Sequence, residues 1–243
     1  MMKAKRLMTA LATTALAMAA MMLASCADSD DGLQTEVKTD QPAEVGKTPV
    51  GFSAYTERGM TRGGQTGLMD ISALRKSEAE GGGFGVFAYY TDLKKYNQTY
   101  VPNFMYNQGV FYNAGKWEYS PLMYWPNEYG MDAQSDDEDK VSFFAYAPYV
   151  KHTSAASGSV ADATSGITGF SRNSTAGDPL VKYIANFNTA NIVDLCWGVV
   201  GNGETRWGKI DGDAEQTMTA GLPWLNVEHP KGIDQRMKFT FKH

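Results

Sequence analysis

Histidines are the side chains in this sequence that most often hold a catalytic metal, and their positions argue against that chemistry here. His152 lies beside a polar stretch, His229 precedes a proline, and His243 is the last residue given. No two of them have the close spacing with which zinc-binding motifs place their ligands. The sequence therefore predicts no metal site, no metallohydrolase and no cofactor.

Carboxylates gather at residues 136–139, where the sequence reads Asp-Asp-Glu-Asp. Such a run could bind calcium, but it lacks the alternate-residue ligand spacing of a helix-loop-helix site. Two carboxylates could also cleave a glycosidic bond if a fold held them roughly 5 to 10 Å apart, a distance that no sequence supplies. The interpretation favoured here is a solvated turn whose charges discourage pairing at a sheet edge.

Nucleophiles and phosphate loops give no stronger signal for catalysis. The glycine-rich stretches at residues 81–85 and 201–203 do not run from a strand into a helix, so they are interpreted as turns. Ser53, inside the sequence GFSAY, lies in a strand-like pattern and not on a strand-to-helix elbow. We therefore expect that the chain is not an enzyme.

Aromatic side chains offer a binding site instead of a catalytic one. Four of them lie close together in the sequence and could stack on sugar rings: Trp117, Tyr119, Tyr124 and Trp125. Tryptophan and tyrosine also fill the cores of β-sandwiches, and we favour that role for these four.

Cys26 is the residue whose chemistry is best defined. A basic start at Lys3, Lys5 and Arg6 precedes the apolar residues 7–23, a pattern typical of an export signal. The sequence Leu-Ala-Ser-Cys at residues 23–26 resembles the lipobox of bacterial lipoproteins, in which the cysteine sulfur is acylated and becomes the first residue. Acyl chains contribute roughly 0.8 kcal/mol per buried methylene, so two or more of them anchor a domain to a membrane.

Charge and cysteine content limit the remaining functions. The formal net charge is −5, and it becomes more negative if residues 1–25 are lost, because they contain three cationic side chains. An acidic chain without a basic patch is a poor partner for nucleic acid. The second cysteine, Cys196, has no partner for a disulfide if Cys26 is acylated, and we expect a buried, inert thiol.

Period-two alternation predicts an all-β fold behind a short acidic tether at residues 26–47. Only residues 69–80 have helical character, enough for one or two turns. We expect residues 153–178 and 202–221 to be exposed loops, because serine, threonine, alanine and glycine dominate the first and polar residues the second. The expected strands lie at residues 50–56, 84–90, 103–112, 117–119, 141–147, 180–187, 192–200 and 237–241, and they predict an antiparallel β-sandwich.

Three segments resemble the fimbrillin family of lipoprotein pilin precursors from Gram-negative anaerobes. They are NFMYNQGVFYNAGKWEYSPLMYWPN at residues 103–127, VSFFAYAPY at residues 141–149, and VGFSAYTERGMTRGG at residues 50–64. The resemblance implies transthyretin-like β-sandwich domains and assembly into pili. On this basis residues 1–25 are a lipoprotein signal peptide and residues 48–243 an N-terminal fimbrillin domain. We expect the second domain of the family to be absent or incomplete here, and the N-terminal domain to be truncated at its C-terminus.

The resemblance also implies a processing site and a strand that is displaced. In better-known members an arginine-specific protease cuts after the first strand and removes it together with the lipid. Here the cut would follow Arg58 or Arg62, and the displaced strand would carry Val50, Phe52 and Ala54 on its apolar face. The vacated groove accepts a donor strand from the next subunit, so other pilin subunits are the expected partners.

Members of the family usually continue past a strand like residues 237–243 into the domain that donates its tail. This chain is therefore expected to accept a strand. A terminal, accessory or anchor role in adhesion is favoured for the same reason. The acids at residues 28–31 resemble a signal for display on the outer face of the outer membrane, although a periplasm-facing location stays open. The alternative function is a surface lipoprotein that binds host or bacterial glycan or protein.

Overall fold

The structure is a computed structural model that describes residues 48–56, 69–92, 94–126, 139–186, 188, 192–207, 215–229 and 236–243. Cys26, Arg58, Arg62 and residues 136–138 lie outside these ranges. Within the described part of the chain, no helix has the length and apolar character that crossing a membrane requires.

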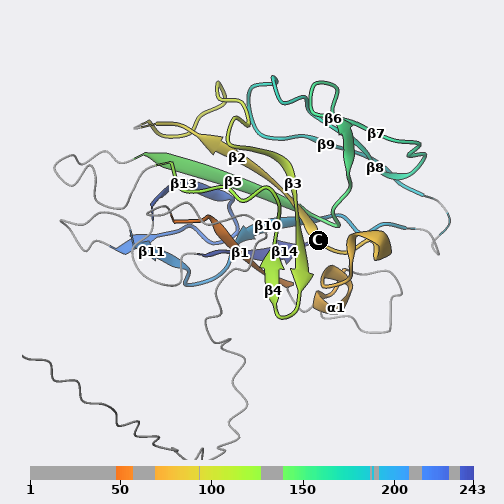
Figure 1. Ribbon diagram of the computed structural model, residues 1–243, viewed down its shortest axis with the longest axis horizontal. Coiled ribbons are helices and arrows are strands. Elements are labelled where there is room, and N and C mark those ends of the chain that lie inside the picture. The colour runs from red at the N-terminus through yellow and green to blue at the C-terminus, as the bar shows by residue number, and fades with distance from the viewer. Residues whose placement is uncertain are drawn as a thin grey trace, which may run out of the picture. The chain divides into compact units, whose positions relative to one another are not determined.

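Strands dominate the described residues, and most of them belong to one large sheet (Figure 1). Its path runs through β1 (Gly51–Thr56), β14 (Arg236–Lys242), β10 (Cys196–Val200), β5 (Lys140–Ala147), β2 (Phe84–Tyr90), β3 (Met105–Asn113) and β4 (Lys116–Glu118), and β13 (Trp224–Glu228) pairs with β5. A second sheet contains β6 (His152–Ser154), β7 (Ser159–Val160), β8 (Gly166–Phe170) and β9 (Val181–Ile184). The strands β11 (Thr205–Trp207) and β12 (Glu215–Thr217) pair with each other.

The strand β5 lies at the centre of the large sheet and is buried on both faces. Val141 and Phe143 point into a main core that also contains residues from β1, β2, β3, β13 and β14. Phe144 and Tyr146 point the opposite way, into a second core shared with β2 and β8. Because both faces are covered, the sequence of β5 is apolar almost throughout instead of alternating with charged residues.

The large sheet curves until its two ends meet. The chain that enters β1 and the chain that leaves β4 form an isolated bridge between Pro49 and Tyr124. Two hydrogen bonds flank this bridge, from Val50 N to Met123 O at 2.8 Å and from Trp125 N to Thr48 O at 2.9 Å. The all-β prediction is therefore confirmed, in a sandwich that is partly closed like a barrel.

Among the described residues, helical structure is limited to α1 (Ile71–Leu74) and the 3₁₀ turn η1 (Glu78–Glu80), as the sequence predicts for this segment. The carboxylate of Asp70 caps α1 by accepting a hydrogen bond from Ala73 N at 2.7 Å. Leu74 is the buried residue of α1 and joins the main core.

The prediction of an exposed loop at residues 153–178 is wrong in part, because strands occupy several stretches of this segment, although many of its residues are exposed. This segment contributes β7 and β8 and most of β6 to the second sheet, and Ile167 and Phe170 are buried in the second core. Two large apolar side chains are enough to pack this segment against the second core, because its small residues let neighbouring backbone segments approach each other closely. A Cβ atom on Gly158 would lie only 2.2 Å from the carbonyl oxygen of Phe170.

One further difference concerns the direction of β1. The sheet is antiparallel along the rest of its path, as predicted, but β1 pairs with β14 in parallel. Gly51 lies opposite Arg236, and Thr56 lies opposite Phe241. A parallel partner so far along the chain cannot be read from local alternation, because the pattern of apolar residues is the same in either direction.

Candidate functional site

The first strand and the groove that holds it form the candidate site. The strand lies at the start of the sheet path, so β14 is its one ladder partner among the described strands. Its other edge is held at the entrance by the contacts of Thr48 and Val50 with the chain after β4. The prediction of a strand at residues 50–56 is therefore confirmed.

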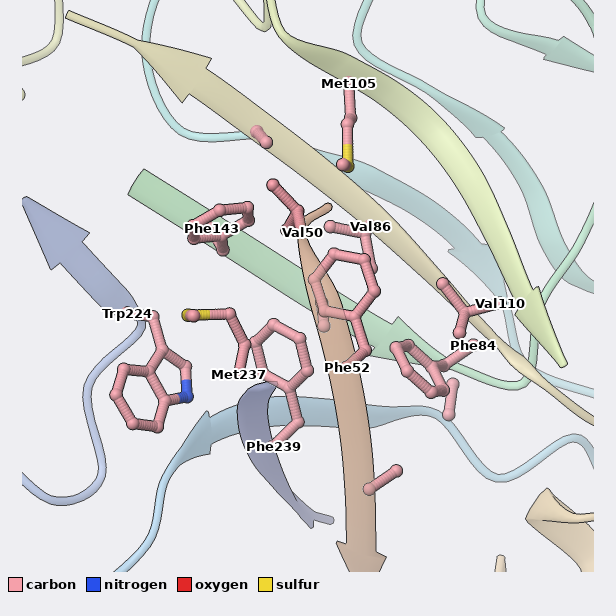
Figure 2. Close-up of a cluster of buried hydrophobic side chains, with 14 of the residues drawn as sticks. Val50, Phe52, Phe84, Val86, Met105, Val110, Phe143, Trp224, Met237 and Phe239 are labelled. Atoms are coloured by element: carbon pink, nitrogen blue, oxygen red, sulfur yellow. The ribbon is translucent and has the colours of Figure 1, made fainter. Parts of the chain in front are cut away.

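Phe52 is the central side chain of this strand and is only 2% exposed. Figure 2 shows its ring in the middle of the main core, between Phe84 and Phe239. The ring centroids of four neighbours lie within 6.3 Å of it: Tyr119 at 5.3 Å, Phe143 at 5.9 Å, Phe239 at 6.0 Å and Phe84 at 6.3 Å. The arrangement combines edge, tilted and stacked contacts, the geometries that aromatic pairs prefer.

Val50 and Ala54 occupy the same face of the strand as Phe52 and are buried to a similar degree. Removal of the strand would leave a groove with a deep central pocket for the ring and two shallower positions. It would also leave the outer edge of β14 without its backbone partners. Such a groove matches an extended peptide with apolar residues at alternate positions.

The hydroxyl of Tyr119 ties this strand to the rest of the sheet. It donates to Val50 O at 2.7 Å and contacts Met123 O at 3.2 Å, and it accepts from Met123 N at 3.3 Å. Burial raises the pKa of Tyr119 above the ordinary value for a tyrosine. The neutral hydroxyl therefore takes part in the hydrogen bonds that position the start of β1.

A second tyrosine hydroxyl makes the same kind of backbone hydrogen bonds at the end of β5. The hydroxyl of Tyr146 contacts Val150 O at 3.2 Å and accepts from Val150 N at 3.3 Å. Both tyrosines precede a cis-proline by two residues, Pro121 in one case and Pro148 in the other. The sequence contains this repeated Tyr-x-Pro pattern, which is the signal from which these hydrogen bonds could be found.

The opposite face of β1 is less well packed and less well hydrogen-bonded than its core face. Ser53 is 7% exposed, and its hydroxyl oxygen has no hydrogen-bond partner among the described residues. Tyr55, two residues further on, is 52% exposed. The strand is thus held mainly by its apolar face and its backbone.

The four aromatic residues considered for glycan stacking do not form an exposed platform. Tyr119 and Trp125 are buried in the main core, at 7% and 4% exposure. Trp117 and Tyr124 are partly buried, and the ring of Trp117 lies 5.1 Å from that of Phe84. Most of their ring area is therefore used inside the protein.

Cys196 is fully buried at the start of β10. Burial and the nearby carboxylate of Asp194 raise the pKa of its thiol to about 12. The thiol is therefore protonated at neutral pH in the protein as described, and it is not an activated nucleophile.

Comparisons with known proteins find two fimbrial proteins that are similar to this chain. Among solved structures, a fimbrial protein from Bacteroides vulgatus matches with a TM-score of 0.50 and 24% sequence identity, over 80% of this chain and 45% of that one. Among curated proteins, the fimbrium subunit Fim1C of Phocaeicola vulgatus is 32% identical over 137 residues. No protein-family profile matches the chain.

Both of these proteins are described as fimbrial, and this chain is similar to a part of each. The matched region covers 55% of this chain but 30% of Fim1C, so the chain spans well under two thirds of either relative. The similarity thus concerns part of each relative, so a function inferred for this chain from those proteins is a proposal.

Proposed function

We propose that this chain is a surface-anchored fimbrillin-like subunit that joins other pilus subunits by exchanging β1 for a strand of its neighbour. The observation that carries the proposal is the position of β1, which is at the start of the sheet path yet supplies the central aromatic ring of the main core. The similarity to a fimbrium subunit supports the same role. Its function is adhesion at the cell surface and not catalysis.

Release of β1 begins at a cut after Arg58 or Arg62. Arg58 follows the end of β1 by two residues, so a cut there separates the strand from the rest of the domain. The acyl chains on Cys26 anchor the uncut protein to the outer membrane and leave together with the strand. A subunit that is not cut keeps β1 and the anchor, and it serves as the base of an assembly.

The donor strand must reproduce the pattern of β1. It presents a large apolar side chain to the pocket of Phe52 and smaller ones to the positions of Val50 and Ala54. Backbone hydrogen bonds to the edge of β14 provide affinity, and the three pockets provide specificity. Because such an exchange buries a whole strand, we expect dissociation to be very slow.

The proposal is tested by treating the purified full-length chain with an arginine-specific protease in the presence of a partner pilin subunit. We expect a new N-terminus after residue 58 or 62, followed by ladders that resist SDS. Arg58→Lys combined with Arg62→Lys abolishes both, whereas Arg172→Lys, at an exposed arginine elsewhere, changes neither. Ladders that form equally well with the uncut double variant would refute strand exchange by this route.

A further inference from the structure

Three side chains that could hold a metal meet at the junction of β10 and β14. Among the described residues, Asp194, Cys196 and His243 place one ligand atom each within 4.8 Å of the others. The antiparallel register brings them together, because Trp197 lies opposite Lys242 and the residues next to this pair are Cys196 and His243, whose side chains are in contact. The sequence predicts no metal site because this pairing joins residues 47 positions apart.

The distances are close to those of a coordination shell. His243 Nδ1 lies 2.7 Å from Asp194 Oδ2 and 3.5 Å from Cys196 Sγ. Sulfur and nitrogen ligands of a tetrahedral zinc ion are about 3.5 Å apart, since the bonds are about 2.3 and 2.05 Å long. Nitrogen and oxygen ligands are about 3.3 Å apart, so the imidazole and carboxylate need to separate by about half an ångström.

The surroundings hold the carboxylate in place and leave a path to solvent. Met69 N donates to Asp194 Oδ2 at 2.6 Å, a contact of the kind that orients a ligand from outside the coordination shell. The side chains of Asp194 and His243 are 15% and 33% exposed, whereas Cys196 is buried. A cation can therefore enter from the side of Asp194 and His243.

We propose that Asp194, Cys196 and His243 form a binding site for zinc or a similar divalent transition-metal ion, with water as a fourth ligand. A thiolate, an imidazole and a carboxylate together suit zinc, whereas calcium and magnesium prefer oxygen ligands. Binding replaces the thiol proton, which passes to solvent, and no redox change is involved. The ion joins the start of β10 to the end of β14 and stabilises the folded chain.

The test is a titration of the purified full-length chain with Co²⁺ and Zn²⁺, without a histidine tag because a tag binds the same metals. We expect one ion per chain and a Co²⁺ spectrum with a thiolate-to-metal charge-transfer band, which reports a sulfur ligand directly. Added Zn²⁺ displaces Co²⁺, removes the band and raises the unfolding temperature.

Three variants assign the ligands: Cys196→Ser, Asp194→Asn and His243→Ala. Each lowers Zn²⁺ affinity by more than tenfold, since loss of groups outside the coordination shell already costs about 10- to 100-fold. His152→Ala is the matched control, because this partly buried histidine lies near Asn107 and Tyr106 and not near the three ligands. It leaves Zn²⁺ affinity unchanged.

A spectrum of the unmodified chain without the charge-transfer band overturns the proposal, and this measurement does not depend on whether any variant folds. Equal Zn²⁺ affinity in Cys196→Ser also overturns it. Either result assigns the three residues to a hydrogen-bonded cluster in which the imidazole and thiol contact one carboxylate.

Discussion

Phe52 is the residue through which β1 contributes most to the main core. Its ring is surrounded by four other aromatic rings, and its exposure is 2%. The sequence places it correctly, because Val50, Phe52 and Ala54 alternate with more polar neighbours. The pocket that receives the ring could not be predicted, since its walls come from distant strands.

Replacement of this ring should destabilise the whole domain. We expect Phe52→Ala to lower the free energy of unfolding by about 3 to 5 kcal/mol, the usual cost of a large aromatic-to-alanine change in a core. The matched control is Tyr55→Ala on the same strand, whose ring is 52% exposed and which should change stability by less than about 0.5 kcal/mol. Urea unfolding measures both, and equal effects would contradict the burial of Phe52.

Tyr119 and Tyr146 should make the domain sensitive to alkaline pH. Burial raises the pKa of both hydroxyls above the ordinary tyrosine value of about 10, so the folded protein keeps them neutral where the unfolded chain ionises. Their contribution to stability is complete below about pH 10 and is lost as the pH rises toward the folded-state pKa. The free energy of unfolding should therefore be flat from pH 7 to 9 and fall above pH 10.

The variant Tyr119→Phe separates this effect from general alkaline damage. It removes the hydrogen bonds to Val50 and Met123, so stability at pH 7 should fall by about 1 to 3 kcal/mol. It should also make the decrease above pH 10 less steep, because one titrating group is gone. An unchanged slope would show that Tyr119 does not titrate with unfolding.

At the scale of elements, the second sheet shows where sequence reasoning failed. Residues 153–178 look like a loop because serine, threonine, alanine and glycine dominate them. In the structure Ile167 and Phe170 fill the second core, and glycines let neighbouring backbones approach closely. The strands that sequence did predict, such as β2 and β5, have many large apolar side chains.

Gly158 tests this close approach. Both Gly158 and Gly81 have positive φ angles, 68° and 77°, so alanine is strained at each. A Cβ atom on Gly158 would lie 2.2 Å from Phe170 O, whereas nothing lies within 4 Å of one on Gly81. We expect Gly81→Ala to cost about 1 kcal/mol and Gly158→Ala clearly more, as measured by thermal unfolding. Equal costs would mean that residues 153–178 do not adopt this packing.

The pairing of β10 with β14 shows a second limit of sequence reasoning at this scale. Alternation predicts both strands but not which residues face each other. The register places Trp197 opposite Lys242 and so brings the neighbouring Cys196 and His243 close together. With Asp194 they form a cluster that spacing along the chain does not indicate. Contacts of this kind arise from strand order, which depends on the whole fold.

At the scale of the whole molecule, the sheet joins two strands that lie far apart in the sequence, β1 and β14. β1 pairs in parallel with β14 at one end of the sheet path, and it is the N-terminal strand that contributes to the main core. We propose that β1, whose one ladder partner among the described strands is β14, is exchanged for a strand of similar pattern. The proposed assembly depends on that exchange.

The most direct test uses the strand itself as a probe. The full-length chain is cut with the arginine-specific protease, its released strand is separated, and a labelled peptide of residues 48–56 is added. We predict that the peptide binds the cut chain, dissociates over hours, and does not bind the uncut chain. A peptide carrying Phe52→Ala should bind at least tenfold more weakly, and one carrying Tyr55→Ala should bind nearly as well as the original. Failure of the peptide to bind a cut chain that remains folded would contradict the exchange of β1.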